Sequence, residues 1–247
     1  MFNDRLETMR PSSLEQDIDR KAELLQNVPL FAGLGLLEIR SLAEMAMVRH
    51  VPTDTLILLA EEEGDTLFVI VNGRVKVTVM SEDGREVILS ILKDGHIFGE
   101  MSLLDGKPRS ASVISTDETE LIMLRRSEFL MHLARYPEMA TKMLATLASR
   151  LRRTNRQVES LALLNVYGRI AGTLLQLGED QGVKTTIGIT IAERPIHQEI
   201  GNMAGTTRET VSRVLNDLER RGYVTRDGRS IVIQNPSRLR EDFFHLG

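Results

Sequence analysis

The 247-residue chain contains no cysteine and no tryptophan, and aromatic residues make up only 4% of it. The absence of cysteine excludes disulfide bonds, thiolate zinc sites, cysteine-ligated iron–sulfur clusters and cysteine nucleophiles. No apolar run approaches the roughly 18 residues that a membrane-spanning helix needs. The first 21 residues also lack the apolar core of a signal peptide. We therefore expect a cytoplasmic protein that makes no contact with a membrane.

The chain also lacks an excess of positive charge. It has 31 Lys and Arg residues against 35 Asp and Glu residues, a formal net charge of −4. Any surface that binds nucleic acid must therefore be local. The sequence contains no nucleophile–base set, metal-ligand cluster or nucleotide-hydrolysis loop, so we predict neither an enzyme nor a metal site. A hydrophobic content of 42% is nevertheless enough to form a core.

Strand signals dominate the region between residues 22 and 134. Two short helical patterns come first, near residues 21–26 and 36–47. Alternating apolar residues then flank Asn72-Gly73, the strongest short hairpin signal. The turn pairs Asp83-Gly84, Asp94-Gly95 and Asp105-Gly106 follow at a regular spacing, with strands expected at residues 87–92, 111–116 and 120–125. This spacing predicts an antiparallel sandwich or jelly roll.

Residues 137–163 are predicted to form one long helix. Leu144, Leu147, Leu151, Thr154, Val158 and Leu161 are spaced like the a and d positions of a heptad repeat. The helix could pack on its own domain, or it could pair with a second copy as a parallel coil, which is the interpretation we favour. The hydroxyl of Thr154 needs a hydrogen-bond partner in either case.

A helix-turn-helix pattern lies between residues 196 and 223. A first helix is expected at residues 198–204, Gly205 breaks it, and Thr207 is a good cap for a second helix. Val211, Val214, Leu215 and Leu218 would form the buried face of that helix, and Arg208, Glu209, Ser212, Arg213 and Asn216 the exposed face. Arginine can pair with guanine, glutamate with cytosine, and a threonine hydroxyl with a phosphate.

Local charge and a second hairpin support a DNA-binding interpretation. Residues 194–229 contain seven arginines against five carboxylates, although the whole chain is acidic. Two short strands around Arg226 and Arg229 would form a wing that brings both arginines near the DNA backbone. The alternative is an ordinary helical hairpin whose charged face is simply solvated.

A possible anion site lies near residue 100. Gly99 precedes a short helix, whose free backbone N–H groups can bind phosphate, and Arg109 could add charge-assisted hydrogen bonds. Glu100 is an odd neighbour for a phosphate, but it could accept a hydrogen bond from a sugar hydroxyl. A Glu–Arg ion pair that stabilises a turn remains an open alternative.

Residues 98–113 read FGEMSLLDGKPRSASV, which resembles the phosphate-binding cassette of cyclic-nucleotide-binding domains. Residues 22–234 as a whole resemble the Crp/Fnr family of bacterial transcription regulators, in its cyclic-AMP receptor branch. Residues 161–175, LALLNVYGRIAGTLL, resemble the hinge and first DNA-domain helix of that family.

The resemblance implies an α+β fold with an N-terminal antiparallel β jelly roll, a long dimerisation helix and a C-terminal winged helix-turn-helix domain. We expect an N-terminal extension at residues 1–21, which is either flexible or a loosely attached helix. The cyclic-nucleotide-binding jelly roll is expected at residues 22–134, the dimerisation helix and hinge at 135–164, and the DNA-binding domain at 165–247. A homodimer would form through the helix at 137–163.

The resemblance also implies the ligand-binding residues and the effector. Glu100 would accept from the ribose 2′-hydroxyl. Arg109 and Ser110 would bind the cyclic phosphate, helped by backbone groups of Gly99 and Met101, and Thr154 and Asn155 would meet the purine. Asn155 differs from the serine typical of this branch, which affects base selectivity. The expected ligand is cyclic AMP or a related cyclic nucleotide, with no metal.

In the DNA-binding domain, Arg208, Glu209 and Arg213 match base-reading positions, so the resemblance implies a TGTGA-type palindrome in double-stranded DNA. Gln198 and Thr207 match phosphate-contacting positions, Ser212 lies on the same face, and His197 stands where arginine is common. Residues 179–185 and 82–86 match surfaces that contact RNA polymerase.

Two alternatives stay open after this comparison. The same DNA-binding fold could respond to cyclic GMP, to cyclic di-GMP or to no effector. The chain could also be a cyclic-nucleotide regulatory module that does not bind DNA.

Overall fold

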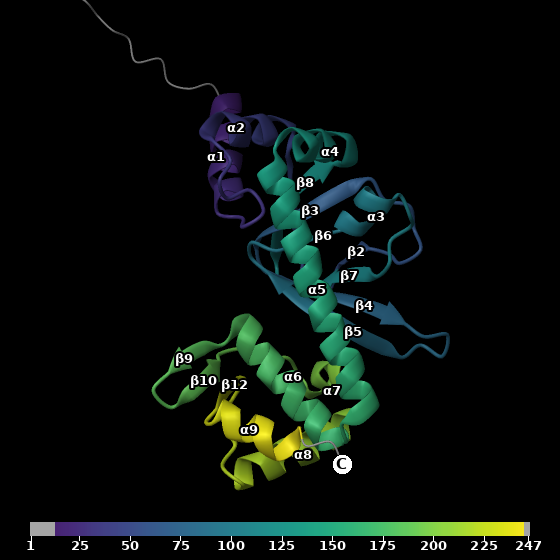
Figure 1. Cartoon of the computed structure of the whole chain (residues 1–247), viewed down its shortest axis with the longest axis vertical. Coiled ribbons are helices and arrows are strands. Elements are labelled where there is room, and N and C mark those ends of the chain that lie inside the picture. Colours follow the sequence, from purple (N-terminus) through teal and green to yellow (C-terminus); the bar gives the residue numbers. More distant parts are fainter. Residues whose placement is uncertain (1–12, 245–247) are drawn as a thin grey trace, which may run out of the picture. The chain divides into compact units, whose positions relative to one another are not determined.

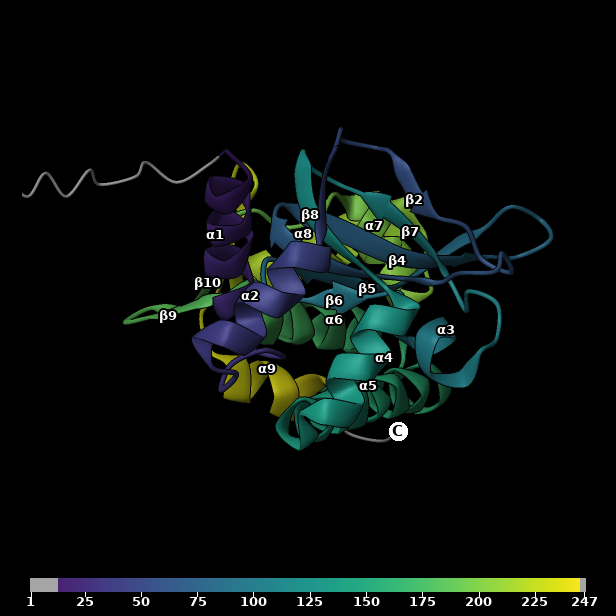
Figure 2. The same ribbon diagram turned by 90° about the horizontal axis from the view of Figure 1, so that it is seen from above.

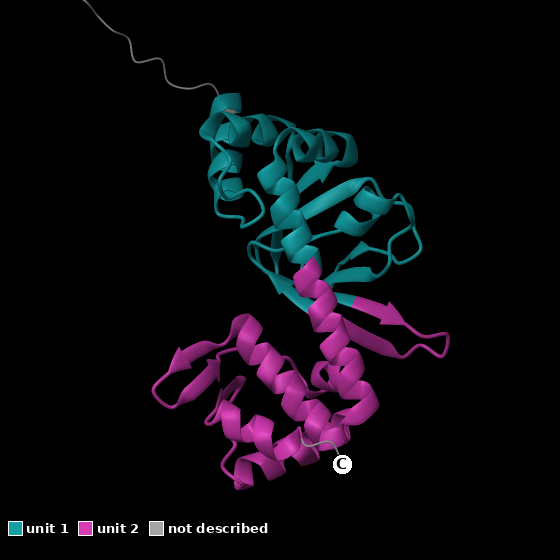
Figure 3. Ribbon diagram, viewed as in Figure 1, with its two compact units in different colours: residues 1–77, 91–147 teal, residues 78–90, 148–247 magenta. Residues whose placement is uncertain are grey.

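The computed structural model describes residues 13–244 and separates the chain into two compact units (Figures 1 and 3). One unit comprises Met1–Val77 and Ile91–Leu147, and the other comprises Thr78–Ser90 and Ala148–Gly247. The mixed helix and strand content agrees with the expected α+β class. Within the described residues, no helix is both long and apolar enough to cross a membrane.

The first unit contains two sheets, apart from the segment Thr78–Ser90 of the second sheet, which belongs to the second unit. Their strand orders are β1-β8-β3-β6 and β2-β7-β4-β5. The strands are β1 (Met47–Val51), β2 (Leu56–Leu58), β3 (Thr66–Asn72), β4 (Arg74–Met80), β5 (Glu86–Lys93), β6 (Ile97–Phe98), β7 (Ser112–Ser115) and β8 (Thr119–Arg125). The helices are α1 (Ser13–Gln26), α2 (Leu36–Met45), α3 (Glu100–Asp105), α4 (Arg126–Arg135) and the beginning of α5 (Pro137–Leu163).

Strand β3 is buried on both of its faces. Its residues Leu67 and Val69 join a cluster with residues of α1, α2, α4 and α5, which lie together in Figures 1 and 2. Phe68 and Ile70 point the other way, into the core between the two sheets. Phe68 also stacks on Phe98 of β6, with ring centroids 4.9 Å apart. Strand β6, and the segment that follows it, are thereby anchored to the centre of the sandwich.

The prediction that Asn72-Gly73 forms a hairpin is wrong. Strands β3 and β4, which flank this dipeptide, belong to different sheets. Gly73 has φ +101°, and a Cβ there would lie 2.8 Å from Thr119 Cα. The turn therefore carries the chain across the sandwich, because Ile70 and Val75 on either side of it are buried in the same core. The Asp83-Gly84 turn instead joins β4 and β5, which pair with each other.

Helix α1 begins at Ser13 rather than near Lys21, so part of the expected N-terminal extension is structured. Ala22 and Leu25 are buried in the helical cluster, and Ile18 packs against it. Lys21 is also buried, and its ammonium donates to the Ala46 carbonyl at 2.9 Å. Residues 1–12 of the expected extension lie outside the described residues.

Helix α5 runs from Pro137 to Leu163, which confirms the predicted long helix. Leu144, Leu151 and Val158 of the heptad pattern are 67%, 62% and 61% exposed in the single chain, whereas Leu147 packs against the helical cluster of the first unit. The sequence also predicts that Asn165 caps a helix that begins near Val166. This prediction is confirmed, because the Asn165 side chain accepts from the Gly168 N–H at 3.1 Å.

The rest of the second unit combines helices with a third sheet. Its sheet has the strand order β11-β12-β10-β9. The elements are α6 (Val166–Gln181), β9 (Val183–Thr185), β10 (Gly188–Ile191), α7 (His197–Ala204), α8 (Arg208–Arg220), β11 (Val224–Asp227), β12 (Ser230–Ile233) and α9 (Pro236–Phe243). Strands β11 and β12 form the predicted second hairpin.

From its two glycines, the sequence predicts a loop at Gly178–Gly182. This prediction is wrong, because α6 continues to Gln181. Gly178 is buried within the helix, and a Cβ there would lie 3.2 Å from Ile189 Cγ2. This glycine therefore permits close packing of α6 on β10 instead of ending the helix.

Replacing Asn165, the cap of α6, tests how much this cap contributes to the free energy of unfolding. Asn165→Ala should lower the free energy of unfolding by about 1 kcal/mol, because the Gly168 N–H loses its acceptor. Asn165→Ser, which keeps a capping oxygen, should lower it much less. Urea denaturation followed by circular dichroism measures both. Equal stability of the alanine variant and the unmodified protein would contradict the proposed cap.

Candidate ligand pocket and nucleic-acid interface

The first candidate site begins where β6 ends. Gly99 follows Phe98 with φ +80°, in the left-handed region, and α3 starts at the next residue. A Cβ at Gly99 would lie 2.7 Å from Arg109 Nη1 and 3.0 Å from the Thr66 carbonyl oxygen. Both the backbone conformation and the space therefore require glycine here. The first turn of α3 has no side-chain cap, so its N–H groups are available for another acceptor.

Arg109 is the central residue of this pocket, and it is only 4% exposed. Its Nη1 donates to the Gly99 carbonyl at 2.6 Å and its Nη2 donates to the Thr66 carbonyl at 2.9 Å. Its Nε is buried and has no hydrogen-bond partner among the described residues. A Cβ at Gly64 would lie 2.0 Å from that Nε. The guanidinium thus lies between two glycines that leave room for it.

The charge of Arg109 is only partly balanced. Burial lowers its pKa, and the carboxylates of Asp65 and Glu100 act in the opposite direction. Glu100 is itself 1% exposed at the start of α3. Because a guanidinium keeps its proton at all physiological pH values, this pocket holds a permanent buried cation beside an acceptor.

The structure brings five of the predicted ligand residues together around the start of α3. These are Gly99, Glu100, Met101, Arg109 and Ser110. The exposed Ser110 hydroxyl lies 3.5 Å from Met101 Sδ. Thr154 and Asn155 have exposed side chains and belong to the part of α5 in the second unit. Their predicted contact with a purine stays a prediction.

The second candidate site is the helix-turn-helix of α7 and α8. Gly205 ends α7 in the left-handed conformation, with φ +62°. The Thr207 side chain accepts from the Thr210 N–H at 3.3 Å, which confirms the predicted cap of α8. The predicted buried face is also confirmed, because Val211, Val214, Leu215 and Leu218 have no exposed surface.

The opposite face of α8 borders an open depression. Its lining consists of His197, Arg208, Glu209, Ser212, Arg213, Asn216 and Arg220. Arg208, Glu209 and Arg213 are exposed, and Ser212 is half-buried. Hydrogen bonds from its own N–H and from the Thr207 hydroxyl, together with the charge of Arg208, lower the pKa of Glu209. Glu209 is therefore an ionised acceptor at neutral pH, and the arginines beside it are donors.

The remaining predicted DNA-contacting residue is Gln198, on the first turn of α7. Its exposed side chain donates to Asn202 Oδ1 at 2.9 Å. The structure thus places all six predicted DNA-binding residues on α7, α8 and the turn between them.

The wing is tied to α8 by Arg226. Its Nε donates to Glu219 Oε2 at 3.1 Å, its Nη2 donates to Asn216 Oδ1 at 2.7 Å, and its backbone N–H donates to Glu219 Oε1 at 3.0 Å. The sequence suggested that Arg226 would lie near the DNA backbone. In the structure it also fixes the position of β11 against α8.

Sequence reasoning missed the electrostatic surroundings of His197. Burial lowers its pKa, and the positive charges of Arg194, Arg226 and Arg208 lower it further. Burial and the charges of Arg226 and Arg229 likewise lower the pKa of Arg194. A pattern search cannot find this cluster, because its members come from four different parts of the second unit.

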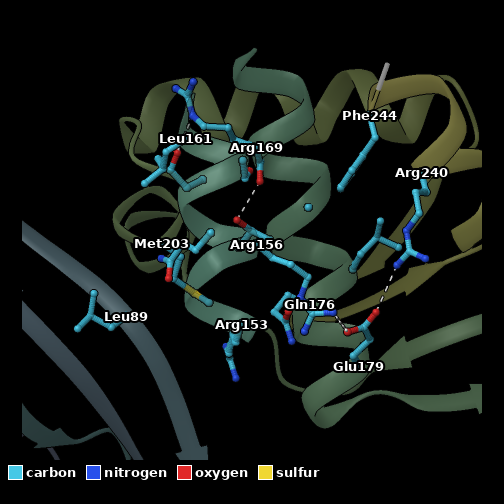
Figure 4. A pocket seen from close by; sticks show the side chains of 16 residues that line it. Leu89, Arg153, Arg156, Leu161, Arg169, Gln176, Glu179, Met203, Arg240 and Phe244 are labelled. Atoms are coloured by element: carbon cyan, nitrogen blue, oxygen red, sulfur yellow. Dashed lines mark hydrogen bonds and ion pairs between the residues drawn. The ribbon is translucent and has the colours of Figure 1, made fainter. Parts of the chain in front are cut away.

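A separate cavity of about 120 Å³ lies elsewhere in the second unit, between α5, α6, α7 and α9 (Figure 4). Four arginines and Glu179 are the charged residues of its lining. Arg156 and Arg240 lie 3.8 Å and 3.3 Å from carboxylate oxygens of Glu179, and Arg153 lies 2.7 Å from Asp180. Arg169 donates to the backbone carbonyls of Ala204 and Leu164, so each of these arginines already has a partner within the second unit.

Comparison with known proteins identifies the two halves of the chain. A model of the cyclic nucleotide-binding domain matches residues 48–136, and a model of the Crp-like helix-turn-helix domain matches residues 168–242. The first match includes the Arg109 pocket, and the second includes both helices of the DNA-reading motif.

Similar proteins match over most of the chain. A CRP-like cAMP-activated global transcriptional regulator of Mycobacterium tuberculosis is 32% identical over 217 residues, which are 88% of this chain and 97% of that protein. The structure of FixK2 from Bradyrhizobium japonicum is similar with a TM-score of 0.70 and 26% identity, over 79% of this chain and 96% of that chain. The structure of the c-di-GMP responsive global regulator CLP of Xanthomonas campestris is also similar, with a TM-score of 0.68 and 25% identity. The match covers 81% of this chain and 100% of that chain.

The interaction of Arg226 in the wing with Glu219 of α8 can be tested by pH-dependent unfolding. Hydrogen bonds from Arg226 lower the pKa of Glu219. A lowered carboxyl pKa adds stability above the ordinary value of about 4.3, and that stability is lost as the pH falls through the folded-state pKa. Glu219→Gln should therefore destabilise the protein at pH 7, by at most about 1 kcal/mol for a pair partly open to solvent.

The same substitution should have progressively less effect as the pH falls through the folded-state pKa of Glu219, because the carboxylate of the unmodified protein is then protonated. Thermal unfolding across this pH range measures the difference. Asp227→Asn, at an exposed position of the wing turn, is the matched control and should unfold like the unmodified protein. A pH-independent effect of Glu219→Gln would contradict the ion-pair assignment.

Proposed function

The chain belongs to the Crp family of ligand-responsive, DNA-binding transcription regulators, and we propose that it is a homodimeric regulator with cyclic AMP as its effector. The observation that carries this proposal is the presence in one chain of a buried Arg109 beside Glu100 and an exposed helix face with Arg208, Glu209 and Arg213. The first pair suits a cyclic nucleotide, and the second set suits base edges in a major groove.

We assign the jelly roll to residues 22–134, the dimerisation helix and hinge to 135–164, and the DNA-binding domain to 165–247, with an extension at 1–21. The matches of the two family models at residues 48–136 and 168–242 support this division. A regulator of this kind works where the DNA is, so we place the protein in the cytoplasm.

In the ligand pocket, a cyclic phosphate would neutralise the buried guanidinium of Arg109. Ser110 and the N–H groups at Gly99 and Met101 would hold the remaining phosphate oxygens, and Glu100 would accept from the ribose 2′-hydroxyl. Thr154 and Asn155 would contact the purine. The cAMP-activated relative from Mycobacterium tuberculosis supports cyclic AMP as the effector.

Cyclic di-GMP is the alternative effector, because the similar regulator of Xanthomonas campestris responds to it. A second phosphate would need further cations at the pocket. Lys107, which is exposed, is the additional basic residue within the cassette. The single buried arginine therefore favours a cyclic mononucleotide.

At the DNA interface, α8 would enter the major groove, where Arg208 and Arg213 can pair with guanine and Glu209 with the amino group of cytosine. Gln198, Thr207 and Ser212 would contact the backbone. The preferred half-site would resemble TGTGA. A homodimer would place two such helices about 34 Å apart and would therefore read a palindrome.

The exposed stripe of Leu144, Leu151 and Val158 supports a dimer that forms through α5. Ligand binding would favour extension of the coil through about Leu161 and would rotate the DNA-binding domains about the hinge at Asn165. Ligand and DNA would then strengthen each other's binding, commonly by about 1–3 kcal/mol.

Contact with RNA polymerase would complete the activator function. Residues 82–86 form the turn between β4 and β5, and residues 179–185 form the end of α6 and strand β9. Both segments are exposed charged surfaces over most of their length.

The effector assignment is tested by calorimetric titration with cyclic AMP, cyclic GMP and cyclic di-GMP in parallel. We expect cyclic AMP to bind at two sites per dimer. Arg109→Leu should weaken this binding by at least about tenfold, the equivalent of 1.4 kcal/mol, because the cyclic phosphate loses its charge-assisted donor. Lys107→Gln is the matched control and should bind like the unmodified protein.

Because Arg109 also holds two carbonyl groups, thermal unfolding must show that the leucine variant is folded, and Arg109→Lys offers a second test with the charge retained. An unchanged affinity in a folded Arg109→Leu variant would contradict the pocket. If only cyclic di-GMP binds, the effector is cyclic di-GMP instead of cyclic AMP, and the assignment of the pocket stands.

The DNA-reading assignment is tested with a set of duplexes that carry single changes in a TGTGA palindrome. Arg208→Gln should lose discrimination at one base position, at a cost of about 1–3 kcal/mol. Arg221→Gln, which removes a cation at the far end of α8 that pairs with Asp217, should keep the full base preference. Competition binding measures both, and a uniform loss across all duplexes would show that Arg208 contacts only the backbone.

A further inference from the structure

Four arginines and one histidine converge beside the DNA-reading helix. The cation cluster consists of Arg194, His197, Arg208, Arg226 and Arg229, from the loop before α7, the first residues of α7 and α8, and the wing. A hydrogen bond of 2.9 Å from the Arg194 N–H to the Arg229 carbonyl joins the loop to the wing. The wing itself is tied to α8 through Arg226 and Glu219. The cluster is therefore built by tertiary contacts and is held in place.

Two nitrogen atoms in this cluster lack a hydrogen-bond partner. His197 Nε2 and Arg194 Nε are both buried, and neither has a partner among the described residues. A buried polar atom without a partner costs free energy, so native structures rarely keep one without a reason. A group that accepts hydrogen bonds and carries negative charge would satisfy both atoms.

The position of His197 indicates which anion this is. His197 lines the same depression as Arg208, Glu209 and Arg213, the residues that we assign to base reading in the major groove. It also begins α7, where the N-terminal end of the helix favours negative charge. A phosphate of the DNA backbone at the edge of the groove has the charge and the acceptor oxygens that this position lacks.

We propose that His197 binds a backbone phosphate of the DNA and takes up a proton as it does so, so that the protein binds DNA more tightly as the pH falls. This inference rests on the proposed DNA-binding function and adds a regulatory input to the same interface. It depends on His197, because histidine is the one residue type of the cation cluster that can gain or lose its charge near neutral pH.

The direction of the effect follows from the surroundings of the imidazole. In the free protein, burial and the charges of Arg194, Arg226 and Arg208 hold the pKa of His197 below its ordinary value of about 6.5. A phosphate placed against Nε2 stabilises the imidazolium and raises that pKa. Between the two pKa values the complex holds one more proton per subunit than the free protein.

The other charged groups around His197 keep their charge over this pH range. The arginines of the loop, α8 and the wing stay protonated. The pKa values of Glu209 on α8 and of Glu219, which is bound to Arg226, are lowered, so both stay ionised. Glu199 on α7 accepts a hydrogen bond from the Ile196 N–H at 3.0 Å. Within this interface, therefore, His197 is the group that titrates.

The thermodynamic linkage between proton uptake and DNA binding sets how strongly the DNA affinity depends on pH. Uptake of one proton per subunit allows the affinity of a dimer to rise by up to roughly 100-fold for each unit that the pH falls. The rise stops below the pKa of the free protein, where His197 is charged in both states. We expect an increase of about three- to thirtyfold between pH 8 and pH 6.5, which is well below that limit.

The experiment measures the dissociation constant for a labelled duplex with a TGTGA palindrome, by fluorescence anisotropy with saturating cyclic AMP. The pH is varied from about 6 to 8.5 at constant ionic strength, because phosphate contacts depend strongly on salt. His197→Asn should remove the pH dependence and keep the weaker, high-pH affinity. His197→Arg should also remove it, but should keep an affinity at least as high as that of the unmodified protein at low pH.

His50→Asn is the matched control, since His50 is an exposed histidine on β1 of the first unit. It should retain the full pH dependence. Histidine NMR gives an independent reading: the pKa of His197 should rise when the duplex is added, and an unchanged value would overturn the inference. A pH dependence that persists in His197→Asn would overturn it as well.

A scrambled duplex of the same length separates this inference from the proposed function. If the unmodified protein prefers the palindrome at every pH but shows no pH dependence, the inference fails and the function stands. If neither the unmodified protein nor His197→Arg prefers the palindrome at any pH, the DNA-binding function fails, and the inference fails with it.

Discussion

The double burial of strand β3 is the constraint on which the first unit depends. Leu67 and Val69 pack under the helices while Phe68 and Ile70 fill the space between the sheets. Strand β6 pairs with β3, and the Phe68–Phe98 stack fixes where it ends. The Thr66 carbonyl at the start of β3 then receives Arg109. The candidate pocket is thus an extension of the core, and its geometry is as rigid as the packing that supports it.

Both candidate sites contain buried nitrogen atoms that have no hydrogen-bond partner in the part of the chain that the structure describes. These atoms are the Nε of Arg109 at one site, and the Nε2 of His197 and the Nε of Arg194 at the other. A stable fold without a ligand would favour paired or solvated charges, as in the ion pairs around Glu179. We propose that both places receive an anion, which would accept hydrogen bonds from these nitrogens. A cyclic phosphate and a DNA phosphate are the two anions that our proposals assign.

Local sequence patterns determined a large part of this structure. The bounds of α5, the caps at Asn165 and Thr207, the buried face of α8 and the wing hairpin all depend on residues close together in the chain. Helical periodicity and capping are local interactions, so a single sequence contains the information. The Gly99–Arg109 spacing was informative for the same reason, because a short helix and one turn separate the two residues.

Other features depended on contacts between distant segments. Asn72-Gly73 looks like a hairpin, yet its strands enter different sheets because each buries a face in one common core. Gly178 looks like a helix end, yet it lies inside α6 because Ile189 packs against it. The environment of His197 requires a loop, two helices and a wing to meet. The sequence by itself determined where the helices lie and which residues face outward, because these follow from local periodicity. Only the tertiary structure decided which strands pair and which charges meet, because both depend on packing between segments far apart in the chain.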